Sequence, residues 1–390
     1  MGRRARDARL RMGGDPAPPD GRGETRDAAI PAAAGRAWAS CARRLLAWFD
    51  PSRRPMPWRE TREPYRIWIS EIMLQQTTVA AVVPYYRRFV AAFPTVAALA
   101  AAPPDAVMKM WEGLGYYSRA RNLHKAARIV AGRHGGTLPS TVAELAALPG
   151  IGRSTAGAIA SIAFGRDEPV LDGNVRRVVA RLLGMRGDLA RPTSLRALWD
   201  ASRTLIPPGK GRETALALMD LGNLVCTPRD PRCPECPYGR ICRARRDGTP
   251  EEIPLKIRKN PLPHHDIVVA VIEDAKGRVL IGRRPDAGLL GGLWAFPGGK
   301  REKGETLEAA LAREIDGDLG IGIAVGGKIG TVRHAYTHYR VTLHAYRCRP
   351  SRGAPRTSRG AKWIPRSRLA DYALPRSNRK IADFLAIARP

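Results

Sequence analysis

The chain has 390 residues, 44% of them hydrophobic, which is enough for two or three domains with sizeable cores. No stretch approaches the roughly 18 uncharged apolar residues of a membrane span, and the Arg-rich beginning lacks the apolar centre of a secretory signal, so we expect a cytoplasmic protein that crosses no membrane. The formal net charge is +30. A basic folded surface favours nucleic acid as a partner, although an Arg-rich composition of a whole proteome is an alternative explanation.

Composition divides the chain into four regions. Residues 1–36 are rich in Gly, Pro and Arg without periodicity, and we predict that they are disordered. Residues 37–242 contain short apolar segments separated by Pro and Gly, which predicts an all-α domain. Residues 243–263 hold four prolines and mixed charge and predict a linker. Residues 264–390 predict a smaller α+β domain, so the fold class is multidomain.

The predicted elements follow from the spacing of the apolar residues. In the helical region the expected helices are 37–49, 64–80, 80–92, 105–112, 119–133, 141–148, 153–164, 172–184, 194–206 and 212–224. In the last region, residues 266–274 and 277–285 predict a β-hairpin, residues 293–300 and 339–348 predict strands, and residues 305–316 predict a helix.

The expected helix 64–80 has an unusual composition. It is mostly apolar, yet Glu71 interrupts the apolar run and Gln75 and Gln76 follow about one turn later. Apolar periodicity alone predicts a core helix, and it does not explain why a carboxyl group lies among the core residues.

A tight pair of glycines precedes the expected helix 153–164. In LPGIGRSTAGAI, residues 148–159, Gly150 and Gly152 lie just before the helix begins. Such a turn directs backbone N–H groups and a helix N-terminus outward without a Cβ to obstruct a phosphate. The pattern matches a helix–hairpin–helix, which positions a protein on DNA without reading its sequence. A plain Gly-rich connector is the alternative interpretation.

The segment VLDGNVRRV, residues 170–178, places Asp172 at the start of an expected helix. Asp is a good N-cap, and local sequence favours that structural role. The functional alternative is a carboxylate held at the positive end of the helix, where its ionised form is favoured near neutral pH.

Four of the six cysteines lie close together in the sequence, with the spacing Cx6Cx2Cx5C. They are Cys226, Cys233, Cys236 and Cys242. In a chain without a secretion signal, this clustering predicts a metal site rather than disulfides. Tetrahedral zinc and a 4Fe–4S cluster both fit four thiolates, and the spacing does not distinguish them.

These motifs resemble those of the adenine DNA glycosylase (MutY) family, within the helix–hairpin–helix superfamily that includes endonuclease III. The resemblance covers about residues 37–375. The matching stretches occur in the family's order: PWR (57–59), SEIMLQQT (70–77), WEGLGYYSRARNLHKAA (111–127), LPGIGRSTAGAI, LDGNVRRV and the cysteine motif. The resemblance implies removal of adenine mispaired with 8-oxoguanine or guanine in duplex DNA. It also implies a 4Fe–4S cluster, a monomer, and a place on the nucleoid.

Catalytic roles follow from this resemblance and from the chemistry of base removal. Adenine leaves easily only when its ring is protonated, while the sugar becomes oxocarbenium-like, so an acid and an anion are both needed. Glu71 matches the acid, because apolar surroundings should raise its pKa. Asp172 matches the anion, which could stabilise the sugar cation or bond to it covalently, and Asn174 matches a residue that orients the acids and a water. Arg54, Trp58, Arg59 and Ser154 match the adenine pocket, although Trp58 could equally be a core aromatic.

DNA contacts are implied in the same way. Gln76 and Tyr116 match residues that enter the duplex near the lesion, after the target base has left the stack. Thr77 and Leu114 match residues that contact 8-oxoguanine, and Gly150 and Gly152 match the hairpin.

Ser154 occupies the position at which bifunctional relatives carry a catalytic lysine. A hydroxyl cannot form a Schiff base with the sugar, so we expect a monofunctional enzyme with little strand cleavage. In some family members the residue here is Tyr, so Ser154 could simply fill the pocket.

The C-terminal region resembles a Nudix domain. Residues 298–321 match most of the Nudix box, including Glu305 and Glu314, but Gly317 and Asp318 replace its paired acids. We therefore expect a Nudix-like fold whose hydrolase activity is largely lost. The loop with Tyr336, Thr337 and His338 matches the family's aromatic–Ser–His triplet, which contacts the oxidised base.

Three other functions remain open at this point. A bifunctional endonuclease III-type lyase is disfavoured by Ser154 and by the extra domain. A Nudix nucleotide diphosphatase with a DNA-binding helical domain is disfavoured by Gly317. A non-catalytic DNA-binding scaffold would require Glu71 and Asp172 to be purely structural.

Overall fold

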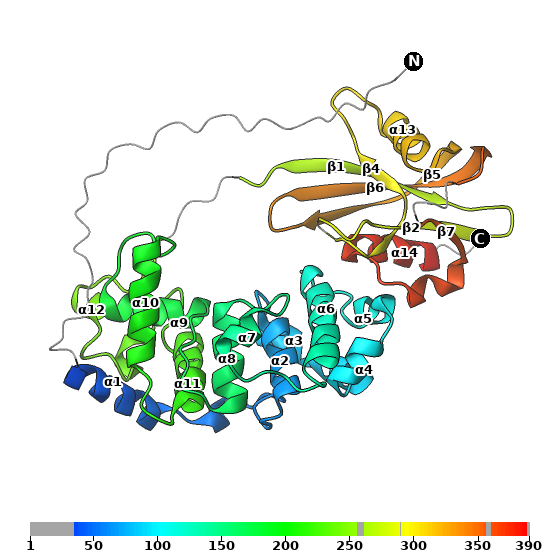
Figure 1. Cartoon of the computed structure of the whole chain (residues 1–390). Coiled ribbons are helices and arrows are strands. Elements are labelled where there is room, and N and C mark those ends of the chain that lie inside the picture. Colours follow the sequence, from blue (N-terminus) through cyan, green and yellow to red (C-terminus); the bar gives the residue numbers. More distant parts are fainter. Residues whose placement is uncertain (1–34, 256–260, 289, 356–359, 388–390) are drawn as a thin grey trace, which may run out of the picture.

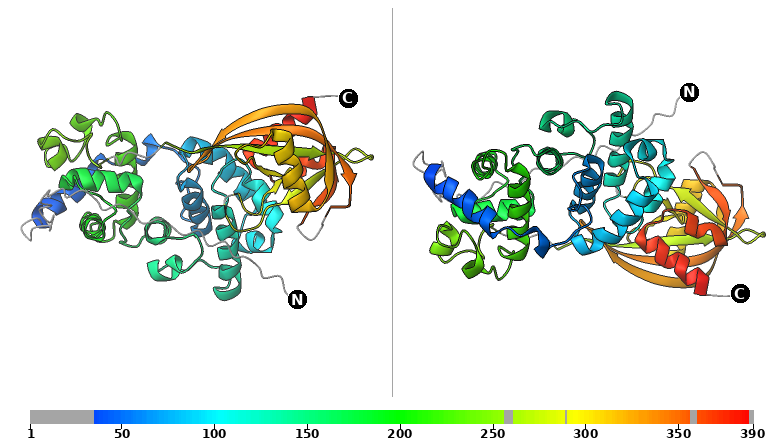
Figure 2. Two further views of the ribbon diagram at one scale, coloured as in Figure 1. Left: turned by 90° about the horizontal axis from the view of Figure 1, so that it is seen from above. Right: turned by 90° about the horizontal axis from the view of Figure 1, so that it is seen from below.

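The computed structural model describes residues 35–255, 261–288, 290–355 and 360–387. Residues 1–34 of the segment 1–36, which was predicted to be disordered, therefore lie outside the described residues. Its last two residues begin α1. Figure 1 shows a helical region with a smaller sheet-containing region packed over one end of it. The two views of Figure 2 agree that α1, α10 and α12 lie at the opposite end of an elongated molecule.

The helical region contains twelve α-helices between residues 35 and 246. They are α1 (Gly35–Trp48), α2 (Pro64–Leu74), α3 (Val79–Ala92), α4 (Val96–Ala101), α5 (Pro104–Met110), α6 (Ser118–Arg133), α7 (Val142–Ala146), α8 (Arg153–Phe164), α9 (Gly173–Leu183), α10 (Pro192–Thr204), α11 (Gly211–Leu224) and α12 (Arg243–Arg246). The sequence did not predict α4. Helix α2 ends at Leu74 and not at residue 80, because Gln76 adopts a left-handed backbone (φ 57°) that a helix cannot continue through.

Two hydrophobic cores divide the helical region into lobes. The first lobe is built from α2 to α8, with Trp68, Phe89 and Trp111 at its centre. The second lobe is built from α1 and from α9 to α12, with Leu45 and Leu221 fully buried. A smaller cluster that includes Ile67 of α2 joins the two lobes. Helix α2 and the beginning of α9 therefore belong to different lobes.

The first part of the predicted linker packs on the second lobe. Residues 243–246 form α12, and Ala244 and Ile253 are buried in the second core at 0% and 1% exposure. The linker was predicted from its four prolines and its mixed charge, and this composition did not indicate that Ala244 and Ile253 are buried in a core. Residues 256–260 lie outside the part of the chain that the structure describes.

The C-terminal region contains two sheets. The larger has the order β4-β1-β6-β5 with β1 parallel to β6, and the smaller has the order β3-β2-β7. The strands are β1 (His264–Ile272), β2 (Arg278–Arg283), β3 (Trp294–Ala295), β4 (Gly298–Lys300), β5 (Gly322–Ala335), β6 (Arg340–Arg352) and β7 (Lys362–Pro365). The predicted hairpin of β1 and β2 is wrong, since these strands share only the bridge Glu273–Val279 and then enter different sheets.

Two helices cover opposite faces of the larger sheet. Leu311 and Ile315 of α13 (Leu307–Leu319) pack on Val268, whereas Ile381 of α14 (Arg376–Ile387) belongs to the core formed with Val269. The alternation of neighbouring β1 residues between the faces explains this division. Helix α14 lies on the side of the sheet that faces the helical region (Figure 1).

Candidate active site and DNA-contacting loops

Glu71 and Asp172 approach each other from the two lobes. Glu71 lies in α2, three residues before the helix ends, and its side chain is half-buried. Burial and, to a smaller extent, the charge of Asp172 raise the pKa of Glu71 to about 7, while Arg59 acts in the opposite direction. An acid with this pKa can hold and deliver a proton near neutral pH.

Asp172 is both a helix cap and a perturbed acid. Its Oδ1 accepts a hydrogen bond from the Val175 N–H at 2.7 Å, which is the N-cap arrangement of α9. Burial raises the pKa of Asp172, while hydrogen bonds from Val175 and Asn174 act in the opposite direction. The sequence prediction considered only the helix end, which favours the ionised form, and it missed the opposing effect of burial.

Asn174 and Ser154 hold the chain around Asp172. Asn174 Nδ2 donates to Asp172 Oδ2 at 3.4 Å, and Asn174 Oδ1 accepts from Arg177 Nη2 at 3.0 Å. Ser154 Oγ accepts from the N–H of Leu171 at 3.1 Å. The hydroxyl at the position of the superfamily's lysine thus supports the backbone next to Asp172.

The two predicted pocket arginines share one carboxylate that the sequence prediction missed. Arg59 donates to both oxygens of Asp220 at 2.7 Å, and Arg54 Nη1 also bonds to Asp220 Oδ1. Asp220 is only 1% exposed in α11. The signal that could have revealed it is the one that singled out Glu71, namely an acid within an apolar helix. Trp58 is 5% exposed and packs edge-to-face on Tyr86, so its place in the adenine pocket stays a prediction.

Gln76 and Tyr116 have the backbone geometry of specialised loop residues. Their φ angles are 57° and 47°, in the left-handed region that is costly for residues other than glycine. Gln76 is exposed, and Tyr116 is one of the few exposed large hydrophobic side chains among the described residues, at 41%. Strain of this kind concentrates at functional sites, which supports a functional role for both side chains rather than a role in stabilising the fold.

Buried Arg119 connects the two loops that carry Gln76 and Tyr116. Its Nη1 donates to the carbonyls of Ile72 and Met73 at 3.0 and 2.7 Å, and also to that of Gln75, at the end of α2. Its Nη2 donates to Thr77 Oγ1 and to the Gly115 carbonyl, each at 3.1 Å. The guanidinium also lies 5.3 Å from the ring centroid of Tyr116. Leu114, in the same loop, is 8% exposed.

The hairpin between α7 and α8 needs one of its glycines for steric reasons. Gly150 has φ +83°, and a Cβ there would meet Asn122 Cβ at 2.8 Å. Gly152 is the N-cap of α8, with open space around its Cα. Gln75 Nε2 donates to the Gly150 carbonyl at 3.3 Å and so ties the hairpin to the end of α2.

The four clustered cysteines are free thiols in the second lobe. Cys233, Cys236 and Cys242 all have raised pKa values, first through burial and then through the charges of neighbouring thiols, Cys226 included. Among the described residues no three His, Cys, Asp or Glu side chains are arranged to hold a single metal ion. Arg181 Nη1 donates to Cys226 Sγ at 3.3 Å, and its buried Nη2 has no acceptor in the described ranges. An anionic group bound between the thiols would supply such an acceptor, so these residues fit a cluster.

The predicted lesion loop lies beside Tyr116. Thr337 and His338 are exposed and Tyr336 is half-buried. The hydroxyls of Tyr116 and Thr337 are 3.3 Å apart, and that of Tyr336 lies 3.3 Å from Ser377 Oγ. In the Nudix box, Arg313 binds both Glu305 and Glu314, each at 2.6 Å at the closest atoms.

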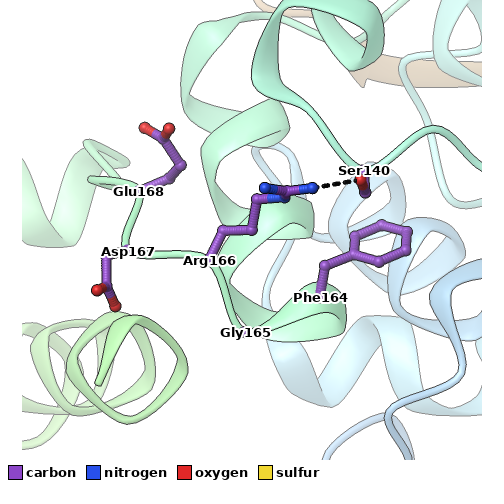
Figure 3. A pocket seen from close by; sticks show the side chains of 6 residues that line it. All are labelled: Ser140, Phe164, Gly165, Arg166, Asp167 and Glu168. Atoms are coloured by element: carbon purple, nitrogen blue, oxygen red, sulfur yellow. Dashed lines mark hydrogen bonds between the residues drawn. The ribbon is translucent and has the colours of Figure 1, made fainter. Parts of the chain in front are cut away.

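A cavity of about 580 Å³ lies beside the α8–α9 connection, away from these groups. It is lined by Ser140, Phe164, Gly165, Arg166, Asp167 and Glu168 (Figure 3). Arg166 Nη2 crosses it to donate to Ser140 Oγ at 2.8 Å. None of the predicted site residues lines this cavity.

Comparisons with known proteins agree with this arrangement. Residues 69–202 match the HhH-GPD superfamily of base excision DNA repair proteins, and residues 268–383 match the NUDIX domain. The adenine DNA glycosylase of Homo sapiens is 34% identical over 86% of this chain and 72% of its own length. The chain belongs to the adenine DNA glycosylase family. The resemblance and the multidomain fold class predicted from the motifs are thereby confirmed.

Further relatives give the same picture. The adenine DNA glycosylase of Buchnera aphidicola subsp. Baizongia pistaciae is 35% identical over 65% of this chain and 72% of its own length. A thermostable thymine-DNA glycosylase structure covers 55% of this chain and 99% of its own, with 32% identity and a TM-score of 0.51. No helix in the described part of the chain is long and apolar enough to cross a membrane.

Proposed function

We propose that this protein excises adenine that is paired with 8-oxoguanine or guanine in duplex DNA. The observation that carries the proposal is Glu71, whose pKa is raised to about 7 by burial and by the charge of Asp172, within a chain of the adenine DNA glycosylase family. A purely structural role for Glu71 would leave a buried carboxyl group in a core helix without a reason, since burial disfavours its charged form.

Glu71 donates its proton to a ring nitrogen of the adenine. The bond between the base nitrogen and the sugar carbon then breaks, and its electron pair leaves with the base. The sugar becomes an oxocarbenium-like cation. Glu71 is ionised after this transfer, and it can accept a proton from the water that attacks the sugar.

Asp172 provides the negative charge that the sugar cation needs. Its N-cap bond to Val175 holds one carboxylate oxygen, which fixes the orientation of the other. Asn174 donates to that second oxygen at 3.4 Å and orients it. A carboxylate placed in this way stabilises the transition state more than the ground state, which is the condition for rate acceleration.

Gln76 and Tyr116 enter the duplex from loops that Arg119 holds together, while Thr77 reaches the opposite base. The side chain of Leu114 is buried in the first core, so it supports the loop that carries Tyr116. Gly150 and Gly152 present backbone N–H groups to the phosphates. Tyr336, Thr337 and His338 contact 8-oxoguanine from the other domain, and Thr337 keeps the hydroxyl that such a contact requires. The adenine itself lies among Arg54, Trp58, Arg59 and Ser154.

Cys226, Cys233, Cys236 and Cys242 would hold a 4Fe–4S cluster, which would cross-link their loop and leave the chemistry to the acids. Arg181 would stabilise the anionic group, since it lies against Cys226 and also donates to the Thr227 carbonyl at 2.7 Å. The protein would act as a monomer at the nucleoid.

Base release from a duplex with adenine opposite 8-oxoguanine tests the proposal. We expect free adenine to form while the strand stays intact until alkali is added, because Ser154 cannot form a Schiff base. Strand cleavage without alkali would indicate a lyase, and release of no base would contradict the proposed activity.

A further inference from the structure

Glu112 joins the helical region to the Nudix-like region. Its Oε1 accepts from Arg379 Nε at 2.9 Å and from the Leu374 N–H at 3.2 Å, and its Oε2 pairs with Lys109. The Glu112 side chain is 14% exposed and that of Arg379 is 24% exposed. Hydrogen bonds between charged groups with so little solvent access are stronger than those on an open surface.

The contacts of Glu112 belong to a closed path through both regions. Arg379 lies in the first turns of α14, two residues after Ser377, whose Oγ is 3.3 Å from the Tyr336 hydroxyl. Thr337 follows Tyr336, and its Oγ1 is 3.3 Å from the Tyr116 hydroxyl. Tyr116 lies in the same loop as Glu112, four residues later. The path therefore begins and ends in the loop between α5 and α6.

Neighbouring contacts show that the two regions are docked along this loop. Leu293 and Ala373 of the Nudix-like region are buried in the core of the first lobe. Trp294 Nε1 donates to Asp105 Oδ2 at 3.3 Å, and Arg121 donates to the Gly291 carbonyl. The apolar contacts hold the regions together without specifying one arrangement, whereas a partly buried carboxylate with directional partners favours one relative position of α14 and the loop.

We propose that Glu112 is a positioning residue that fixes the lesion-reading loop of the Nudix-like region against Tyr116. The loop with Tyr336, Thr337 and His338 then faces the DNA at a set distance from the residue that enters the duplex. The recognition site for the base opposite adenine is thus assembled from both regions before DNA binds. This inference rests on the proposed role of that loop in recognising 8-oxoguanine.

The test compares the rates on two substrates, because a change in a single rate would not separate positioning from a general structural defect. Adenine release is measured on duplexes with adenine opposite 8-oxoguanine and opposite guanine, and the ratio of kcat/KM values is taken. Glu112→Gln and Arg379→Met should each lower this ratio about tenfold, the size of an ordinary coupling between sites, and should leave the rate on the guanine duplex nearly unchanged. The control is Arg352→Met, which removes an exposed pair with Asp316 (3.2 Å) in the same region and should leave the ratio unchanged. Equal losses on both substrates would overturn the inference, because they would indicate only a structural defect.

A double variant identifies the route of the effect. Thr337→Ala should lower the ratio, and adding Glu112→Gln to it should lower the ratio no further, because both changes act on the same loop. An additional tenfold loss in the double variant would contradict coupling through this loop. If Thr337→Ala lowers the ratio and Glu112→Gln does not, the inference about Glu112 fails while the loop keeps its role. If Thr337→Ala leaves the ratio unchanged, the proposed role of the loop in recognising 8-oxoguanine is contradicted, and the inference about Glu112 fails with it.

Discussion

At the scale of single residues, the position of Glu71 sets both its chemistry and its effect on stability. The same burial that raises the pKa of Glu71 to about 7 makes its ionised form unfavourable in the folded chain. The charge of Asp172, from the other lobe, adds to this effect. The ability of Glu71 to donate a proton and its cost to the stability of the fold therefore have the same physical origin. The rate of adenine release measures the first, and the free energy of unfolding measures the second.

The difference in stability between the natural chain and Glu71→Gln should depend on pH. Between the ordinary pKa of 4.5 and the raised value of about 7, the folded chain binds more protons at Glu71 than the unfolded chain does. The free energy of unfolding therefore falls as pH rises through this window, by on the order of 2–3 kcal/mol. Gln remains neutral, so the variant should be more stable than the natural chain at about pH 8 and nearly equal to it at about pH 5. Urea unfolding at both pH values checks this, and a difference that does not change with pH would contradict the raised pKa.

Asp172→Asn separates capping from chemistry. Asn caps helices as well as Asp does and can still accept the hydrogen bond from Val175, so we expect the free energy of unfolding to change by less than about 1 kcal/mol. The charge that stabilises the sugar cation is lost, so adenine release in single turnover should fall by at least about a hundredfold. A variant that folds normally and retains most of its activity would leave Asp172 with the capping role alone.

At the scale of elements, one arginine completes the end of α2, where the left-handed backbone of Gln76 stops the helix predicted over 64–80. Arg119 takes the carbonyls of Ile72, Met73 and Gln75, which are the free acceptors at the end of α2. Its positive charge lies at the negative end of the helix, where the helix dipole favours a cation. The loop with Gln76 and the loop with Tyr116 are consequently held at a fixed separation.

Arg119→Met should loosen both loops together. The carbonyls at the end of α2 and the Gly115 carbonyl would lose their donor in a mostly buried place, so the free energy of unfolding should fall by about 3 kcal/mol. Binding to the lesion duplex should weaken as well, since Gln76 and Tyr116 would no longer be held in their strained conformations. Calorimetry and DNA titration check this, with exposed Arg128→Met of α6 as the control. Unaltered binding by a destabilised variant would show that the loops do not depend on Arg119.

The same elements show what sequence can and cannot predict. Apolar periodicity with Pro and Gly breaks located α8 at residues 153–164, as observed, because that signal is local. The end of α2 depends on Arg119, which lies far along the chain from it, and the pairing of β1 with β6 joins residues about 75 positions apart. Contacts between residues so far apart cannot be predicted from the pattern of a short stretch of sequence.

At the scale of the whole molecule, the functional groups come from three packed units. Glu71 belongs to the first lobe, Asp172 and the cysteines to the second, and the lesion loop to the Nudix-like region. Sequence motifs identified these residues as candidates, and Asp172 is close enough for its charge to raise the pKa of Glu71. Asp220 and Glu112 were not singled out, because their partners lie in other units, and Arg119 was not singled out, because most of its partners lie more than 40 residues earlier in the chain.

The four clustered cysteines should determine the iron content of the protein and the thermal stability of the second lobe. Cys236→Ser should lower the iron content of the purified protein and its visible absorption, since one ligand of the proposed cluster is lost. Because Cys226, Cys236 and Cys242 pack against the core of the second lobe, its thermal stability should fall too. Cys41→Ser, at a buried thiol outside the motif, is the control for iron content. Full iron content in Cys236→Ser would contradict the assignment of this ligand.

The central claim is that Glu71 protonates adenine, and single-turnover release of adenine opposite 8-oxoguanine by Glu71→Gln tests it most directly. Binding of the same duplex is measured alongside. We predict that release falls by at least about a hundredfold, the usual contribution of a general acid, while binding is unchanged. In the natural chain, release should decline as pH rises above about 7, where Glu71 loses its proton. Release by Glu71→Gln within a few-fold of the natural rate would contradict the claim.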